Sequence, residues 1–288
     1  MEDKIFSNVV KFMEKELKYI DENAINSAIT HLNNAYYDLD STEAAKLDFD
    51  DRIYRCGYVY RYFTCFTCVA KQALNDLNVD RFFENWLDGR SVIKLTSLGG
   101  GPGTDLLTFF LFLQQIDTVV EMRGVVLDLS KDWLNCLQYL FKYYDVWNIY
   151  KLSDVEYISF DFLAEIISED VLNEIRRSDV VSMVKFVSSV GFDREFCTEQ
   201  LTTILLALKP NAIVFFMDNS GGKYLELMTK IAKVAHLTPI SQFQHKNIPI
   251  PDSELKEMEM CQYSNMWREP MKTCKVSAAI WRKPIGKK

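Results

Sequence analysis

The sequence has little of what marks a fibrous, low-complexity or membrane protein. Its 288 residues include only 11 Gly and 7 Pro, too few for a collagen-like or linker-rich chain. The nearest candidate for a membrane helix, the mostly apolar stretch 106–113, falls well short of the roughly 20 residues that such a helix needs. The first residues mix acidic and basic side chains, whereas a secretory signal has a basic start and then an apolar stretch. We therefore expect an intracellular protein, cytoplasmic or nuclear, with no membrane partner.

A metal-binding pattern is also absent from the sequence. The seven cysteines are scattered, and the three histidines are far apart. Cys65 and Cys68 form a C-x-x-C pair, but a structural zinc site needs four ligands and no second pair follows at a suitable spacing. We expect buried, reduced thiols and no bound metal.

The acidic balance of the chain disfavours one class of partner. The net charge is −7 at pH 7, which is unlike a surface that coats nucleic acid. A local basic groove stays open, because the last 17 residues contain six Lys or Arg and no acidic residue. We interpret this stretch as a solvated tail after a final strand. The basic residues in it are Lys272, Lys275, Arg282, Lys283, Lys287 and Lys288.

Hydrophobic periodicity divides the chain near residue 90. Before it, apolar spacing predicts helices at the start of the chain, over 21–37 and over 52–77, with a short amphipathic piece at 80–87 and a polar loop or short helix at 38–50. After it, strand and helix patterns alternate. The expected strands are 92–98, 123–129, 157–160, 180–187, 212–217, 239–244 and 275–281, and the expected helices are 104–115, 130–144, 163–177, 194–208 and 224–235.

This alternation predicts an α/β fold. Repeated strand–helix units form a doubly wound, mostly parallel sheet, here seven-stranded, with helices on both faces. We expect two domains, an N-terminal helical cap over 1–90 and a cofactor-binding domain over 91–288. Ligands of such sheets bind outside the carboxyl ends of the strands.

The most informative stretch is a glycine-rich turn between the first strand and its helix. Four of the five residues 99–103 are glycine, which permits positive φ and close approach of a ligand to the backbone. The following helix points free N–H groups at that ligand. Thr104 stands where a dinucleotide fingerprint has its third glycine, and no Lys follows as in a P-loop. The turn predicts a nucleoside cofactor site formed by Gly99, Gly100, Gly101, Gly103 and Thr104; the alternative is a tight turn without a ligand.

The segment LGGGPGTD at 98–105 resembles the first motif of class I S-adenosylmethionine-dependent methyltransferases. The resemblance extends over about residues 90–285. It implies a Rossmann-like methyltransferase fold and S-adenosyl-L-methionine as cofactor. The family often carries an acidic residue near the end of the first strand, where this chain reads Leu-Thr-Ser-Leu at 95–98. Asp105 is the remaining candidate for the cofactor's amino group.

Three further positions match the family at strand ends. Asp128, followed by Leu129, would bind the ribose hydroxyls, because a carboxylate can accept both hydroxyl protons. Asp161 and Phe162 would contact adenine. The segment 183–186, with Met183 and Lys185, would lie beneath the cofactor. Taken singly, Asp128 or Asp161 has a simpler interpretation as a helix N-cap after a strand.

The methyl acceptor is not identified by any motif. The segment 183–190 lacks the Asn/Asp-Pro-Pro-aromatic pattern of adenine and glutamine methylation, and no cysteine nucleophile stands at the fourth or fifth strand end. Lys185 lacks the Asp expected of ribose 2′-O methylation. Our catalytic candidates are Tyr58, Lys185 and Asp218. Tyr58 belongs to an aromatic–arginine helix over 54–63 that would stack on a planar substrate or simply form core. Asp218 belongs to a polar turn over 217–222, whose simpler interpretation is a helix cap at Asn219 or Ser220 with a glycine turn.

These features predict a methyltransferase that acts on an oxygen or nitrogen acceptor. RNA, a protein and a small molecule all stay open as the acceptor, and a protein partner is open as well. The alternative is a catalytically silent S-adenosylmethionine-binding sensor or scaffold subunit of a larger assembly.

Overall fold

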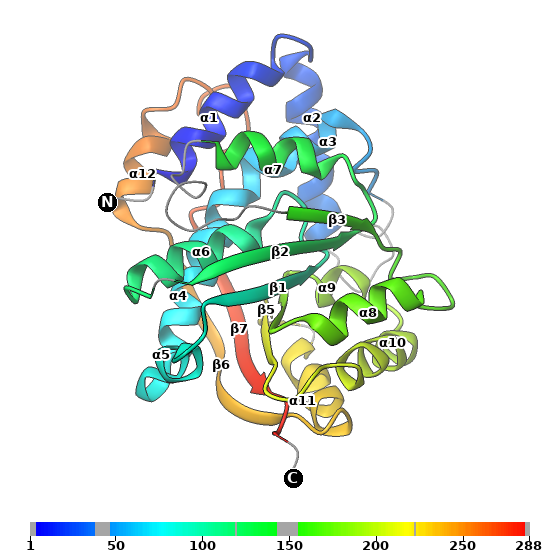
Figure 1. Cartoon of the computed structure of the whole chain (residues 1–288). Helices are drawn as coiled ribbons and strands as arrows, with labels where there is room; N and C mark the ends of the chain where they lie inside the picture. Colours follow the sequence, from blue (N-terminus) through cyan, green and yellow to red (C-terminus); the bar gives the residue numbers. More distant parts are fainter. Residues whose placement is uncertain (1–3, 38–46, 119, 143–154, 222, 286–288) are drawn as a thin grey trace.

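The computed structural model describes residues 4–37, 47–118, 120–142, 155–221 and 223–285 (Figure 1). Its centre is a seven-stranded sheet with the order β3-β2-β1-β4-β5-β7-β6. The first five strands pair in parallel, and β7 runs antiparallel between β5 and β6. This confirms the predicted fold, a doubly wound, mostly parallel Rossmann-like sheet. The strands are β1 (Val92–Leu98), β2 (Glu121–Asp128), β3 (Val155–Ser159), β4 (Val180–Val184), β5 (Ile213–Asn219), β6 (Thr238–Pro249) and β7 (Thr273–Arg282).

Helices cover both faces of the sheet, as Figure 1 shows. One face carries α4 (Thr64–Leu77), α6 (Thr104–Gln115) and α7 (Trp133–Phe141). The other carries α8 (Glu169–Arg177), α10 (Arg194–Leu206) and α11 (Tyr224–Val234). The buried apolar side chains accordingly form two clusters, one on each side. Burial on both faces explains why β4 and most of β5 read as nearly continuous apolar runs.

The N-terminal helices share one of these two clusters with the sheet. Apolar residues of these helices, including those of α4, pack in the same buried cluster as α6 and one face of the strands. A core that runs across residue 90 makes the helices and the sheet depend on one another. The N-terminal elements are α1 (Ile5–Glu16), α2 (Glu22–Tyr37), α3 (Arg52–Tyr58), η2 (Val59–Phe63), η3 (Val79–Arg81) and α5 (Phe82–Leu87).

The predicted long helix over 52–77 contains an irregular turn. It begins at Arg52, capped by the Asp51 carboxylate, which accepts a hydrogen bond from the amide of Ile53 at 2.8 Å. The segment η2 is a π-helix, and α4 then continues to Leu77. π-turns inside α-helices occur often at functional sites. This one carries Arg61 and Tyr62, which line a cavity described below.

Several element bounds differ from the sequence-based ones. The helix expected from 130 begins at Trp133, and its expected end at 144 lies outside the described residues. The helix expected from 163 begins only at Glu169, where the Ser168 hydroxyl caps it. The fourth strand ends at Val184, and a short helix, α9 (Val187–Val190), follows. A helix that the sequence analysis missed, α12 (Asp252–Glu259), lies between β6 and β7.

Two further findings concern membranes and metals. Within the described ranges, no helix has both the length and the apolar character needed to cross a bilayer. The same residues contain no group of His, Cys, Asp and Glu placed to hold a metal ion. All seven cysteines are buried, and none of them forms a disulfide bond.

Candidate functional site

The glycine turn joins β1 to α6 at the carboxyl edge of the sheet. Gly99, Gly101 and Gly103 have φ angles of +62°, +48° and +89°, which other residues rarely adopt. A Cβ atom would lie 2.3 Å from the Phe186 ring at Gly99 and 2.4 Å from the Leu137 side chain at Gly103. At Gly101 the nearest atom is 3.7 Å away, on Trp133. The outer two glycines therefore permit packing, whereas Gly101 leaves the backbone open to a ligand.

A cavity of about 150 Å³ lies against this turn, at the carboxyl ends of the parallel strands. It brings together seven of the predicted cofactor residues from four different strand ends. They are Gly99, Gly101, Asp128, Leu129, Asp161, Phe162 and Lys185. We call this the cofactor cavity. The sequence motifs did not predict most of its other walls, chiefly Tyr36, Leu47, Phe49, Trp133 and Phe160. Val184 also lines the cavity, and it belongs to the segment 183–186 that was expected beneath the cofactor.

Asp128 connects the end of β2 to the glycine turn. Its carboxylate accepts hydrogen bonds from the amide of Gly101 at 2.9 Å and from the amide of Ser130 at 3.2 Å. Burial raises the pKa of Asp128 to about 6. Because each carboxylate oxygen can accept two hydrogen bonds, Asp128 can hold the turn and still accept from a ligand in the cavity.

The remaining predicted cofactor residues lie behind the turn rather than on the cavity wall. Asp105 is 1% exposed and accepts a hydrogen bond from the Ser182 hydroxyl on β4. Burial raises its pKa to about 6. The others in this position are Gly100, Gly103, Thr104 and Met183, and for all five a direct contact with a cofactor stays a prediction.

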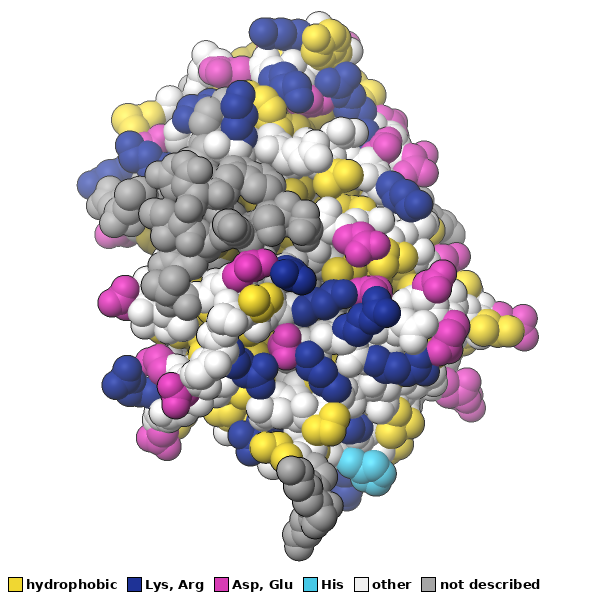
Figure 2. Space-filling view, in the orientation of Figure 1, with side chains coloured by type: hydrophobic (Ala, Val, Ile, Leu, Met, Phe, Trp, Pro, Cys, Tyr) yellow, Lys and Arg dark blue, Asp and Glu magenta, His cyan; other side chains and the backbone are white. Residues whose placement is uncertain are grey.

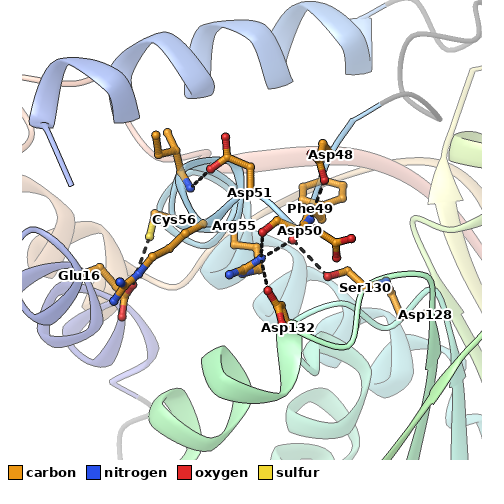
Figure 3. Close-up of polar contacts among 12 residues, drawn as sticks. Glu16, Asp48, Phe49, Asp50, Asp51, Arg55, Cys56, Asp128, Ser130 and Asp132 are labelled. Carbon is orange, nitrogen blue, oxygen red and sulfur yellow. Dashed lines mark hydrogen bonds and ion pairs between the residues drawn. The ribbon is translucent and has the colours of Figure 1, made fainter. Parts of the chain in front are cut away.

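A segment before α3 covers the cofactor cavity from the N-terminal side, and Figure 3 shows how it is fastened. The Arg55 guanidinium donates to the carbonyl oxygens of Phe49 at 2.6 Å and Asp50 at 2.7 Å. It also lies 3.2 Å from the Asp132 carboxylate at the start of α7. The Ser130 hydroxyl donates to the Phe49 carbonyl at 3.2 Å. We call residues 47–51 the strap. A serine at the start of the helix expected over 130–144 predicts an N-cap. That prediction is wrong, because the Ser130 hydroxyl holds the strap and α7 begins beyond it.

A second cavity, of about 210 Å³, adjoins the first. The two share Tyr36, Tyr58 and Lys185, which therefore lie at the boundary between them. We call the second the inner cavity. Its other walls come from α2, η2, α4, α9, β5, β7 and the segment before β7. They are Asn33, Arg61, Tyr62, Phe66, Ser188, Asn219, Met271 and Cys274.

Lys185 stands where the two cavities meet. Its φ of +61° is strained for a residue with a side chain, and its amide donates to the carbonyl of Met217 at 2.8 Å. The ammonium donates to Asn219 Oδ1 and lies 5.2 Å from the centre of the Phe66 ring. The turn after β4 therefore places the Lys185 side chain where the cofactor cavity and the inner cavity meet.

The third catalytic candidate lies outside both cavities. Asp218 is 0% exposed and accepts from the amides of Ser188 at 2.8 Å and Asn219 at 2.7 Å. Burial raises the pKa of its carboxyl group, and the Lys185 charge opposes that shift. Asp218 thus supports the polar turn after β5, while Tyr58 and Lys185 face the cavities.

Comparisons with known proteins find similar structures only. No protein-family model matches the sequence, and no curated protein matches it. The chain is similar to a solved SAM-dependent methyltransferase from Methanosarcina mazei, with 10% identity over 71% of this chain and 98% of that one and a TM-score of 0.44. It is also similar to the N-methyltransferase NodS from Bradyrhizobium japonicum, with 11% identity over 76% of this chain and 97% of that one and a TM-score of 0.41. A third similar structure is an O-methyltransferase family protein from Burkholderia thailandensis, with 13% identity over 92% of this chain and 73% of that one and a TM-score of 0.47. At such identities and scores, the activity has to be argued from this chain's own residues.

Proposed function

We propose that this protein is an S-adenosylmethionine-dependent methyltransferase. The observation that carries the proposal is the cofactor cavity itself. An open glycine backbone at Gly101, a carboxylate at Asp128 and the Asp161–Phe162 pair meet there from three strand ends. A second cavity, of suitable size for an acceptor, shares Lys185 with it.

The residues present fit the proposed cofactor. Asp128 would bind the ribose hydroxyls, and Asp161 with Phe162 would hold adenine, so the adenosine would lie over the ends of β2 and β3. The rest of the molecule would extend towards β4 and Lys185. S-adenosylmethionine, when bound, supplies a methyl group on a positively charged sulfur. Tyr58 and Lys185 would position the acceptor at the junction, and the strap would exclude water.

Surface charge does not select RNA among the acceptors. Figure 2 shows Lys and Arg side chains interspersed with Asp and Glu on the visible face. Many of the basic groups are paired, as in Lys94–Glu174, Arg90–Asp179 and Lys209–Asp179. An acceptor that reaches Lys185 from the inner cavity is therefore better supported than a long RNA held on this face.

Calorimetry with S-adenosylhomocysteine tests the proposal. Gly101→Ala should lower the affinity at least tenfold, because the new methyl group would stand on the cavity wall. Gly89→Ala is the matched control. Gly89 has a φ of +74° with nothing within 4 Å of the added atom and lies outside the cavity, so it incurs the same strain of about 1–2 kcal/mol and should leave the affinity unchanged.

The same experiment separates the proposal from its alternative. If the wild-type chain does not bind S-adenosylhomocysteine, the proposed function is wrong. If it binds, but labelled S-adenosylmethionine transfers no methyl group to RNA, protein or small molecules, the chain is a cofactor-binding sensor or scaffold.

A further inference from the structure

The walls of the inner cavity are aromatic and rich in hydrogen-bond donors. Four aromatic side chains line it, from Tyr36, Tyr58, Tyr62 and Phe66. Tyr58 and Tyr62 lie 5.4 Å apart and Tyr62 stacks on Phe66 at 5.4 Å between ring centres. Such a surface fits a flat ring.

Both charged residues on these walls are cations. Arg61 and Lys185 line the cavity, and no Asp, Glu or His does so among the described residues. The Lys185 ammonium donates to the Asn219 amide oxygen, and its charge also acts on the buried Asp218 carboxyl group, which lies outside the cavity wall. A cationic acceptor such as an amine would meet two positive charges there, whereas an anion would meet its complement.

Two of the donors are buried without a partner. By hydrogen-bond geometry the Tyr62 hydroxyl and the Arg61 Nε atom have no partner among the described residues, and Tyr62 is only 3% exposed. The Arg61 guanidinium lies close enough to Tyr62 to oppose the rise of its pKa, and it donates to the Glu269 carbonyl through another nitrogen. Burial raises the pKa of Tyr62 to about 12, so its hydroxyl keeps its proton and can donate. Because native structures rarely leave buried polar groups unsatisfied, these two donors indicate a ligand group that accepts hydrogen bonds.

We propose that the acceptor of this methyltransferase is a small aromatic carboxylate, bound with its ring among the tyrosines and its carboxylate facing Lys185, Arg61 and Tyr62. The inference rests on the proposed function and names its substrate class. The size agrees, because a cavity of about 210 Å³ is smaller than the roughly 300–1,000 Å³ that drug-sized ligands occupy.

The chemistry of this acceptor suits a cavity without a base. One carboxylate oxygen would donate its electron pair to the methyl carbon, and the pair of the breaking carbon–sulfur bond would go to sulfur. The negative charge on the acceptor and the positive charge on sulfur disappear together. No proton moves, so the residues need only bind and align the acid. The product is a methyl ester.

Calorimetry on the full chain saturated with S-adenosylhomocysteine tests the recognition. The probes are benzoate, its neutral analogue benzamide and the cation benzylamine. We expect benzoate to bind at least tenfold more tightly than either. Equal binding of benzamide, or preference for benzylamine, would overturn the inference while leaving the proposed function standing, because saturation with S-adenosylhomocysteine is established first.

With S-adenosylmethionine, mass spectrometry should detect methyl benzoate, and a benzoate complex without any ester would refute the transfer step.

Two tyrosines provide a matched pair of variants. Tyr62→Phe removes the unpartnered hydroxyl in the cavity, whereas Tyr60→Phe removes a second buried, unpartnered hydroxyl that packs against Trp267. Both variants should keep or raise the melting temperature and keep the affinity for S-adenosylhomocysteine. Only Tyr62→Phe should weaken benzoate binding, by about tenfold. If Tyr62→Phe binds benzoate as the wild type does, the hydroxyl has no such role and the inference fails.

Discussion

Asp128 is the single residue on which the proposed cofactor site most depends. Its carboxylate fastens the Gly101 amide and lines the cavity at the same time. The same burial that positions it also raises its pKa to about 6. Because this carboxyl group ionises close to neutral pH, the affinity for a ligand that it binds should depend on pH.

We expect the affinity for S-adenosylhomocysteine to fall about tenfold between pH 7 and pH 5, because a single group of pKa about 6 becomes protonated and stops accepting ribose hydroxyls. Stability of the free protein should change in the opposite sense. The contribution of a carboxyl group with a raised pKa is fully present below its ordinary pKa and is lost as the pH rises through about 6. Calorimetry between pH 5 and pH 7 measures the change in affinity for S-adenosylhomocysteine.

Asp128→Asn is the control, since it cannot titrate. It should bind weakly and with an affinity that is flat from pH 5 to 7. Asp105 has a similar pKa but lies behind the turn, so Asp105→Asn should preserve the pH dependence. A wild-type affinity that does not change with pH would contradict the role of Asp128.

At the scale of elements, the strap joins the start of α3 to the loop that begins α7. The Arg55 guanidinium makes three contacts that hold the strap, to the two carbonyl oxygens of Phe49 and Asp50 and to the Asp132 carboxylate. Phe49 then packs 5.1 Å from Trp133 and 5.6 Å from Tyr58, measured between ring centres. Arg55 is thus a positioning residue that closes the cofactor cavity without lining it.

Arg55→Met should release the strap. We expect faster amide hydrogen exchange over residues 47–56 and a loss of S-adenosylhomocysteine affinity of several-fold or more, because carbonyl oxygens that accepted from a charged donor lose it. Asp132→Asn removes only the half-exposed ion pair and should change affinity by no more than about twofold. Unaltered exchange and affinity in Arg55→Met would show that the aromatic contacts hold the strap alone.

At the scale of the whole molecule, the first helix is joined to a helix late in the sequence. The Glu254 carboxylate on α12 accepts from the amides of Ile5 at 2.7 Å and Phe6 at 2.8 Å. It therefore caps α1 from a helix almost 250 positions away in sequence, where the helix dipole favours a negative charge. Figure 1 shows α12 beside the start of α1.

Glu254→Gln should lower the free energy of unfolding by about 1–3 kcal/mol, because a buried charged hydrogen-bond pair is lost. Glu259→Gln, on the exposed end of the same helix, should change it by less than about 0.5 kcal/mol. Chemical denaturation measures both. The affinity for S-adenosylhomocysteine should survive in folded Glu254→Gln, and equal stability of the two variants would contradict the capping role.

The sequence by itself determined the sheet and the glycine turn. The bounds of β1 and α6 agree with prediction, because an apolar run, four glycines and a helical pattern are local signals. The order of strand and helix segments then determined which strand ends meet, and so brought Asp128, Asp161 and Lys185 to one edge.

Only the tertiary structure decided what covers that edge. The strap, the π-turn that carries Tyr62 and the contact of Glu254 with α1 all depend on partners far away in the chain. Ser130 illustrates the reason, since its residue type predicts a helix cap and its hydroxyl instead bonds to the Phe49 carbonyl 81 positions earlier. Local pattern reports which conformations a segment prefers, but the partner of a polar group is chosen by packing, which exists only once the chain is folded.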